Sequence, residues 1–89
     1  AFKIAAFLVK KKLVACANII NNVDSIFAWK GKITKASEIL IVGKTMNKNI
    51  QKIIKSVKKL HSYEVPCVIF FDIKGGNSEF LKWIIKETA

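Results

Sequence analysis

An amphipathic helix between two almost continuously apolar stretches is the feature that most constrains this sequence. The spacing predicts a helix over Lys48–Leu60, with Asn47 as its N-cap, lysines on the outer side and an inner apolar stripe made of Ile50, Ile53, Ile54, Val57 and Leu60. The stretch before it, SEILIVGKT (37–45), is typical of a covered, central strand. The stretch after it, VPCVIFFDI (65–73), predicts a second buried strand that starts at Pro66. A helix with a single apolar stripe fits such strands by covering one face of their sheet.

Two more helices are predicted near the ends of the chain. Residues 1–13 carry apolar side chains at helical spacing, and their lysines lie largely off that stripe. Residues 78–88, SEFLKWIIKET, predict a short final helix with Asn77 or Ser78 as its cap. The chain is therefore expected to hold a helix on either side of its β segments.

Strands and turns are predicted between the first two helices. VACANII (14–20) and SIFAWKGKI (25–33) are β-friendly stretches, whereas NNVD (21–24) and, later, KGGN (74–77) are typical of turns. The expected order is helix, strand, strand, strand, helix, strand, helix. We therefore expect a single α+β domain over residues 1–89, a sandwich with a mostly antiparallel sheet and helices on one face. One more strand before the first helix would give the ferredoxin-like βαββαβ pattern, with its second β element long and bent.

The charge of the chain is strongly positive and is carried by lysine alone. Its 16 basic residues against 6 acidic ones give a formal net charge of +10, and none of the basic residues is arginine. A nucleic-acid partner is one interpretation of this balance. The absence of arginine counts against specific recognition, and abundant lysine, isoleucine and asparagine also accompany AT-rich coding sequence. We therefore expect no nucleic-acid partner, and non-specific polyanion binding by the lysine face of Lys48–Leu60 stays an alternative.

The sequence gives no indication of a membrane or of an oxidising compartment. Its longest apolar runs, such as CVIFF, are far shorter than the roughly 18 residues of a membrane span. No signal peptide is visible, and two cysteines in separate elements, Cys16 and Cys67, do not make a disulfide framework. We therefore expect a cytoplasmic protein without a membrane partner.

Five dispersed motifs resemble the CutA family of divalent-cation tolerance proteins. They are LVACANI, SIFAWKGKI, SEILIVGKT, HSYEVP and GNSEFLKWI, and they follow the order and spacing of the family over almost the whole chain. The chain departs from the family pattern at Ser62, where the family has proline, and at Cys67, where it has glutamate. The family's first strand is also missing before the first helix. We expect that this strand belongs to a longer chain, because its absence would leave neighbouring strands without ladder partners.

The resemblance implies a homotrimer whose sheets meet edge to edge. It also implies a role in tolerance of copper and other divalent metals, weakly bound, and no enzymatic activity. The apolar residues of 25–33 independently indicate a long strand edge that must be covered, and a symmetric copy of the chain would cover it. Self-association would have to overcome the mutual repulsion of strongly positive chains.

The candidate metal ligands are Cys16, His61 and Glu64. A thiol and an imidazole suit copper or zinc, and a carboxylate could add an oxygen ligand. No CxxC, HxH or HxxxH spacing occurs, so we expect a weak site assembled across elements or subunits, with no tightly bound ion. Structural interpretations stand beside each residue. Cys16 can be a small buried hydrophobe, His61 can satisfy the last carbonyls of the preceding helix, and Glu64 can form a salt bridge.

The resemblance further places Trp29, Lys44, Thr45, Tyr63 and Glu64 in a cleft between subunits. It therefore leaves a second function open, a non-catalytic trimeric scaffold or a signalling protein similar to the PII proteins, which would bind a small ligand or partner in that cleft. Catalysis is not expected, because neither cysteine has an evident base with an orienting partner and KGGN lacks the features of a phosphate-binding loop.

Overall fold

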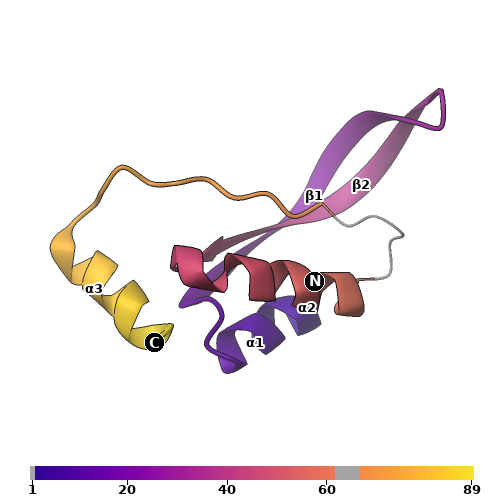
Figure 1. Ribbon diagram of the computed structural model, residues 1–89. Helices are drawn as coiled ribbons and strands as arrows, with labels where there is room; N and C mark the ends of the chain where they lie inside the picture. Colours follow the sequence, from indigo (N-terminus) through magenta and orange to yellow (C-terminus); the bar gives the residue numbers. More distant parts are fainter. Residues whose placement is uncertain (1, 62–66) are drawn as a thin grey trace.

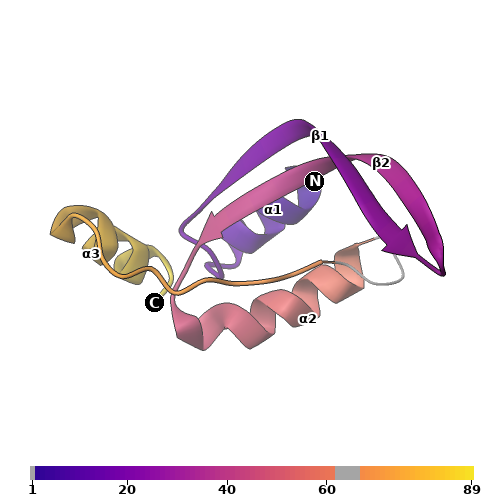
Figure 2. The same ribbon diagram turned by 90° about the horizontal axis from the view of Figure 1, so that it is seen from above.

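The computed structural model describes residues 2–61 and 67–89, in which helices pack beside a long antiparallel hairpin (Figure 1). The described elements follow one another as α1 (Phe2–Lys10), β1 (Cys16–Trp29), β2 (Lys32–Lys44), the 3₁₀ turn η1 (Asn47–Asn49), α2 (Ile50–Leu60) and α3 (Ser78–Glu87). Figure 2 shows α1 and α2 alongside the half of the hairpin in which β1 begins and β2 ends, whereas the turn of the hairpin projects beyond them. The predicted α+β class is confirmed.

The first two β segments form one strand rather than two. β1 runs through the predicted turn NNVD, where the ladder changes register: Ile20 pairs with Leu40, but Val23 pairs with Glu38. One extra residue therefore sits in β1, which is a β-bulge, and Asn22 adopts a left-handed φ of 60°. The predicted turn at 21–24 is wrong because asparagine, which tolerates this conformation, serves bulges as well as turns.

The chain reverses at Lys30 and Gly31, inside the segment 25–33 that was predicted as a strand. Trp29 pairs with Lys32, so the loop of the hairpin has only these two residues, with φ values of 49° and 79°. Positive φ at both positions is the geometry of a type I′ turn, whose twist matches that of the flanking strands. The three strands predicted between the first two helices are therefore the two strands of one hairpin.

The small core draws its residues from α1, the connection to β1 and α3. Its buried apolar residues are Ala5, Leu8, Val14, Ala15 and Ile84. The predicted helix Lys48–Leu60 is present, but it begins with η1, and no side-chain hydrogen bond caps either η1 or α2. The apolar stripe of α2 is at most half-buried, since none of its side chains is shielded from solvent completely.

The buried strand predicted at 65–73 is wrong for residues 67–73, which form no strand (Figure 1). Residues 62–66 lie outside the described part. Ile69, Phe70, Phe71 and Ile73 are 55% to 83% exposed. A strand needs a ladder partner, and among the described residues only β1 and β2 pair with one another. An apolar run is therefore not enough to form a strand here, and residues 67–73 stay irregular and exposed.

Large apolar side chains are also exposed along the hairpin. Those exposed by about two fifths or more are Ile20, Ile26, Phe27, Trp29, Ile33, Ile39, Leu40 and Val42. A two-stranded sheet is marginally stable on its own in water, so these surfaces favour contact with further protein. Among the described residues, no helix has the length and apolar character required to cross a bilayer.

Candidate functional site

Three predicted site residues lie together where the hairpin joins the helices. Cys16 opens β1 and is paired with Lys44, the last residue of β2, while Thr45 follows directly. The Cys16 thiol is partly exposed. The Lys44 ammonium donates a hydrogen bond to Asn18 Oδ1, so its charge is held beside β1. The ladder thus brings a soft thiol and a cation to one end of the sheet.

Thr45 fastens this end of the sheet to both helices. Its hydroxyl donates a hydrogen bond to the carbonyl oxygen of Leu13, just after α1. The Thr45 hydroxyl oxygen also accepts a hydrogen bond of 3.2 Å from Asn49 Nδ2, just before α2. Asn49 is only 5% exposed, so its amide depends on this partner. The family resemblance placed Thr45 in a ligand cleft and did not indicate this structural role.

Replacing Thr45 by valine should destabilise the fold, because it removes the bond to Leu13 and leaves the buried Asn49 amide without its acceptor. The expected loss is about 1–3 kcal/mol in the free energy of unfolding, measured by urea denaturation. Thr34→Val is the matched control, since Thr34 lies on the hairpin and its hydroxyl makes no hydrogen bond to any described residue. Equal losses in the two variants would contradict this role.

His61 lies at the opposite end of α2 from Cys16. The helix starts shortly after Thr45 and has 11 residues, which at 1.5 Å per residue makes it roughly 16 Å long. The backbone N–H of His61 donates to the carbonyl oxygen of Val57 at 2.8 Å and closes the helix. Within one copy of the chain, Cys16 and His61 therefore do not share a metal ion.

The other predicted site residues are separate from this end of the sheet. Trp29 lies beside the hairpin turn, 44% exposed, with Lys30 Nζ 5.8 Å from its ring centroid. Tyr63 and Glu64 lie outside the described residues. In the part of the chain that the structure does describe, no three His, Cys, Asp or Glu side chains gather in a way that would hold a metal ion.

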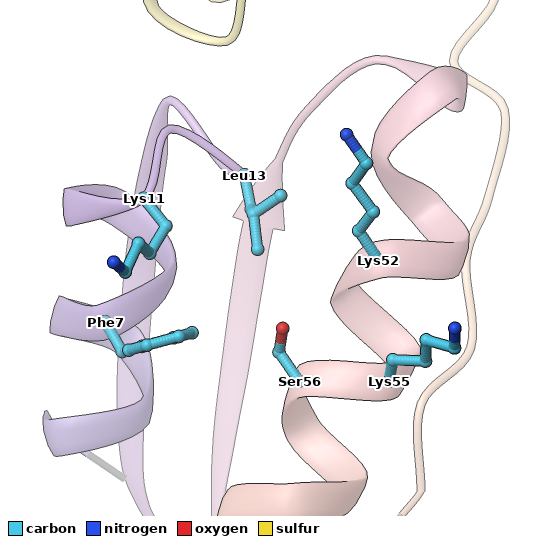
Figure 3. Close-up of a pocket in the computed structure, with 6 residues that line it drawn as sticks. All are labelled: Phe7, Lys11, Leu13, Lys52, Lys55 and Ser56. Carbon is cyan, nitrogen blue, oxygen red and sulfur yellow. The ribbon is translucent and has the colours of Figure 1, made fainter.

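A hollow that the sequence did not reveal lies between α1 and α2 (Figure 3). Its volume is about 310 Å³, and it is lined by Phe7, Lys11, Leu13, Lys52, Lys55 and Ser56. Helical periodicity assigned its lysines to outer faces, which is correct for each helix alone. The hollow arises only because the two helices lie side by side, and no spacing within either helix encodes that arrangement.

Comparisons with known proteins agree on one family. The family model of the CutA1 divalent ion tolerance protein matches residues 1–87. The Protein CutA homolog of Xenopus laevis is 41% identical over 81 residues, which are 91% of this chain and 54% of that protein. The divalent-cation tolerance protein CutA of Archaeoglobus fulgidus is 42% identical over 84 residues, which are 94% of this chain and 81% of that protein.

Solved structures give the same result. The divalent cation tolerance protein (Cut A1) from Thermus thermophilus superposes with a TM-score of 0.96 at 36% identity, over 99% of this chain and 85% of that chain. The CutA structure from Archaeoglobus fulgidus superposes with a TM-score of 0.95 at 39% identity, again over 99% of this chain and 85% of that chain. The chain spans about half the length of the first curated relatives it matches, between 47% and 54%.

Proposed function

Because the chain belongs to the CutA1 divalent ion tolerance protein family, we propose that it acts in metal tolerance by binding copper or another divalent cation weakly, at sites shared between copies. The partly exposed Cys16 thiol at the end of the sheet is the observation that carries this proposal, since a thiolate is the strongest ligand for soft metals among the candidates. His61 lies a helix length away, so it would serve a copper or zinc ion held by Cys16 of another copy. We propose no catalytic role, and a cytoplasmic location that keeps both cysteines reduced.

The metal proposal is tested by titrating the protein calorimetrically with Zn²⁺, which binds thiolates without changing oxidation state, and then with Cu²⁺ under anaerobic conditions. We expect Cys16→Ala to weaken Zn²⁺ binding at least about tenfold, which corresponds to roughly 1.4 kcal/mol. His61→Ala should weaken it as well, and the double variant should weaken it by less than the product of the two single effects if both residues bind the same ion.

Cys67→Ala is the matched control, because Cys67 is an exposed cysteine on the irregular segment before α3. Its binding curve should overlay that of the unchanged protein. Identical heats from the unchanged protein and from Cys16→Ala would remove Cys16 from the proposal, whatever the behaviour of Cys67.

We further propose that three copies form the working unit. The exposed apolar residues of the hairpin support self-association, and the resemblance to the family supports three as the number of copies. Each copy carries a formal charge of +10, so mutual repulsion opposes assembly at low ionic strength. The trimer should therefore gain stability as salt rises toward physiological concentration, where exposed charges are screened beyond about 8 Å.

A second candidate function rests on Lys44 and Thr45, which lie together beside Cys16. In a trimeric scaffold or PII-like signalling protein, this end of the sheet would bind an anionic small ligand, with Lys44 as its counter-charge. Saturable binding of such a ligand that disappears in Lys44→Ala but persists in Cys16→Ala would favour this function over metal binding.

A further inference from the structure

The hollow between α1 and α2 has an apolar floor and a positively charged rim. In Figure 3 the ring of Phe7 extends from α1 toward α2, and the Ser56 hydroxyl points into the same space from the other side. Leu13 lies between the two helices and completes the floor together with Phe7. Both apolar side chains are half-buried and therefore remain open to a ligand on one side. The space is a shallow depression of about 310 Å³ that is widely open to solvent, so a ligand would be only partly enclosed.

Two lysines stand on either side of this space. Lys11 directly follows α1 and Lys52 lies in the first turn of α2; Figure 3 shows them on either side of Leu13, with their ammonium groups pointing outward. Lys11 Nζ lies 5.9 Å from the ring centroid of Phe7, within reach of the aromatic face. Lys55 lines the same space farther along α2, although its ammonium group points away from Phe7 in Figure 3.

No carboxylate on the surrounding elements neutralises these lysines. The acidic residues of the chain are Asp24, Glu38, Glu64, Asp72, Glu79 and Glu87. Residues 1–23 and 39–61, which include α1, α2 and their connections to the sheet, therefore contain lysines and no acidic side chain. Within residues 2–61 and 67–89, the rim therefore carries positive charge that no carboxylate of α1, α2 or their connections offsets, and this charge attracts an anion.

We propose that this groove binds a small phosphate monoester that carries an aromatic ring. Lys11 and Lys52 are both exposed, so their side chains can turn inward and hold the phosphate at the rim, where lysine acts as a point charge. The ring lies against Phe7 and Leu13, because a flat apolar group stacks favourably on a phenyl face. Ser56 offers one hydroxyl for a polar substituent. The site is separate from Cys16 and does not depend on the metal proposal.

Phenyl phosphate and inorganic phosphate are the probes, followed by amide chemical shifts in NMR titrations of the unchanged protein. We expect saturable shifts in α1 and α2, and at least about fivefold tighter binding of phenyl phosphate than of inorganic phosphate, since one stacked ring contributes in this range. The double variant Lys11→Gln, Lys52→Gln should weaken both anions about tenfold, as expected for two exposed ion pairs.

The matched control is the double variant Lys30→Gln, Lys32→Gln, which removes the same charge at and beside the hairpin turn. Its affinities should stay within about twofold of the unchanged protein, because the change lies outside the groove. Equal weakening by the two pairs would show attraction by net charge alone and would overturn the proposal.

The ring is tested separately by Phe7→Leu, which keeps an apolar side chain at a half-buried position. We expect phenyl phosphate to lose its advantage while inorganic phosphate binds as before. Retention of the full preference in Phe7→Leu, or shifts spread over the lysines of the whole chain, would also overturn the proposal. A single-stranded oligonucleotide that binds with such spread shifts, and tighter than phenyl phosphate, would instead indicate a polyanion surface.

Discussion

The variant Ile26→Asp, Ile33→Asp should shift the mass in solution from that of the proposed trimer, three times 10.0 kDa, to 10.0 kDa. The two isoleucines are 68% and 77% exposed in a single copy. Ile33 pairs with Ala28, and Ala28 lies two residues beyond Ile26, so both isoleucines lie on one face of the hairpin. An aspartate buried there without a partner costs several kcal/mol, which is enough to separate the copies at micromolar concentration. Light scattering coupled to size-exclusion chromatography measures the result.

Gln51→Asp, Ser78→Asp is the matched control for this prediction. It adds the same negative charge at exposed polar positions on α2 and at the start of α3. Because it lowers the net positive charge, it weakens repulsion between copies and should leave the trimer intact. A trimer that survives both aspartates on the hairpin would exclude that face from the interface.

Leu8→Ala should cause the largest loss of folding stability of any single change considered. Leu8 is 5% exposed and belongs to a core with few members, so truncation leaves a cavity that the surroundings fill only in part. The expected loss is about 2–5 kcal/mol in the free energy of unfolding, typical of buried leucine. The backbone bonds from Leu13 and Val14 to the carbonyl oxygen of Leu8 persist, because alanine keeps that carbonyl.

Val9→Ala provides the comparison for this prediction. Val9 is the next residue of α1 and is 42% exposed, so its truncation should cost less than about 1 kcal/mol. Both variants are measured by urea denaturation at one chain concentration, since self-association links stability to concentration. Similar losses would mean that α1 does not pack as described.

The helices were predictable because each carries its own signal. Apolar residues at helical spacing define the apolar side of α1 and α2 whatever the rest of the chain does. The hairpin was harder to predict from the sequence. Whether NNVD forms a turn or a bulge depends on which residues of β2 lie opposite it. Residues 67–73 show the same limit, since an apolar run becomes a strand only beside a pairing edge.

The candidate site was predictable only in part, for a related reason. Cys16, Lys44 and Thr45 gather because the first residue of β1 pairs with the last residue of β2. His61 is kept away by the length of α2, a geometric fact that its sequence neighbours do not express. The groove between α1 and α2 needed the packing of the two helices, to which both contribute side chains.

The extra residue of β1 sets the direction of the outer half of the hairpin and does not change which residues pair there. Asn21 and Asn22 together stand opposite Ile39, while the pairs on either side of them keep a regular alternation. Deleting Asn22 would leave every cross-strand pair of the outer half in place and change only the angle at which that half leaves the helices. The loss or gain of a single codon could therefore change the direction of the outer half of the hairpin while its cross-strand pairs stay the same.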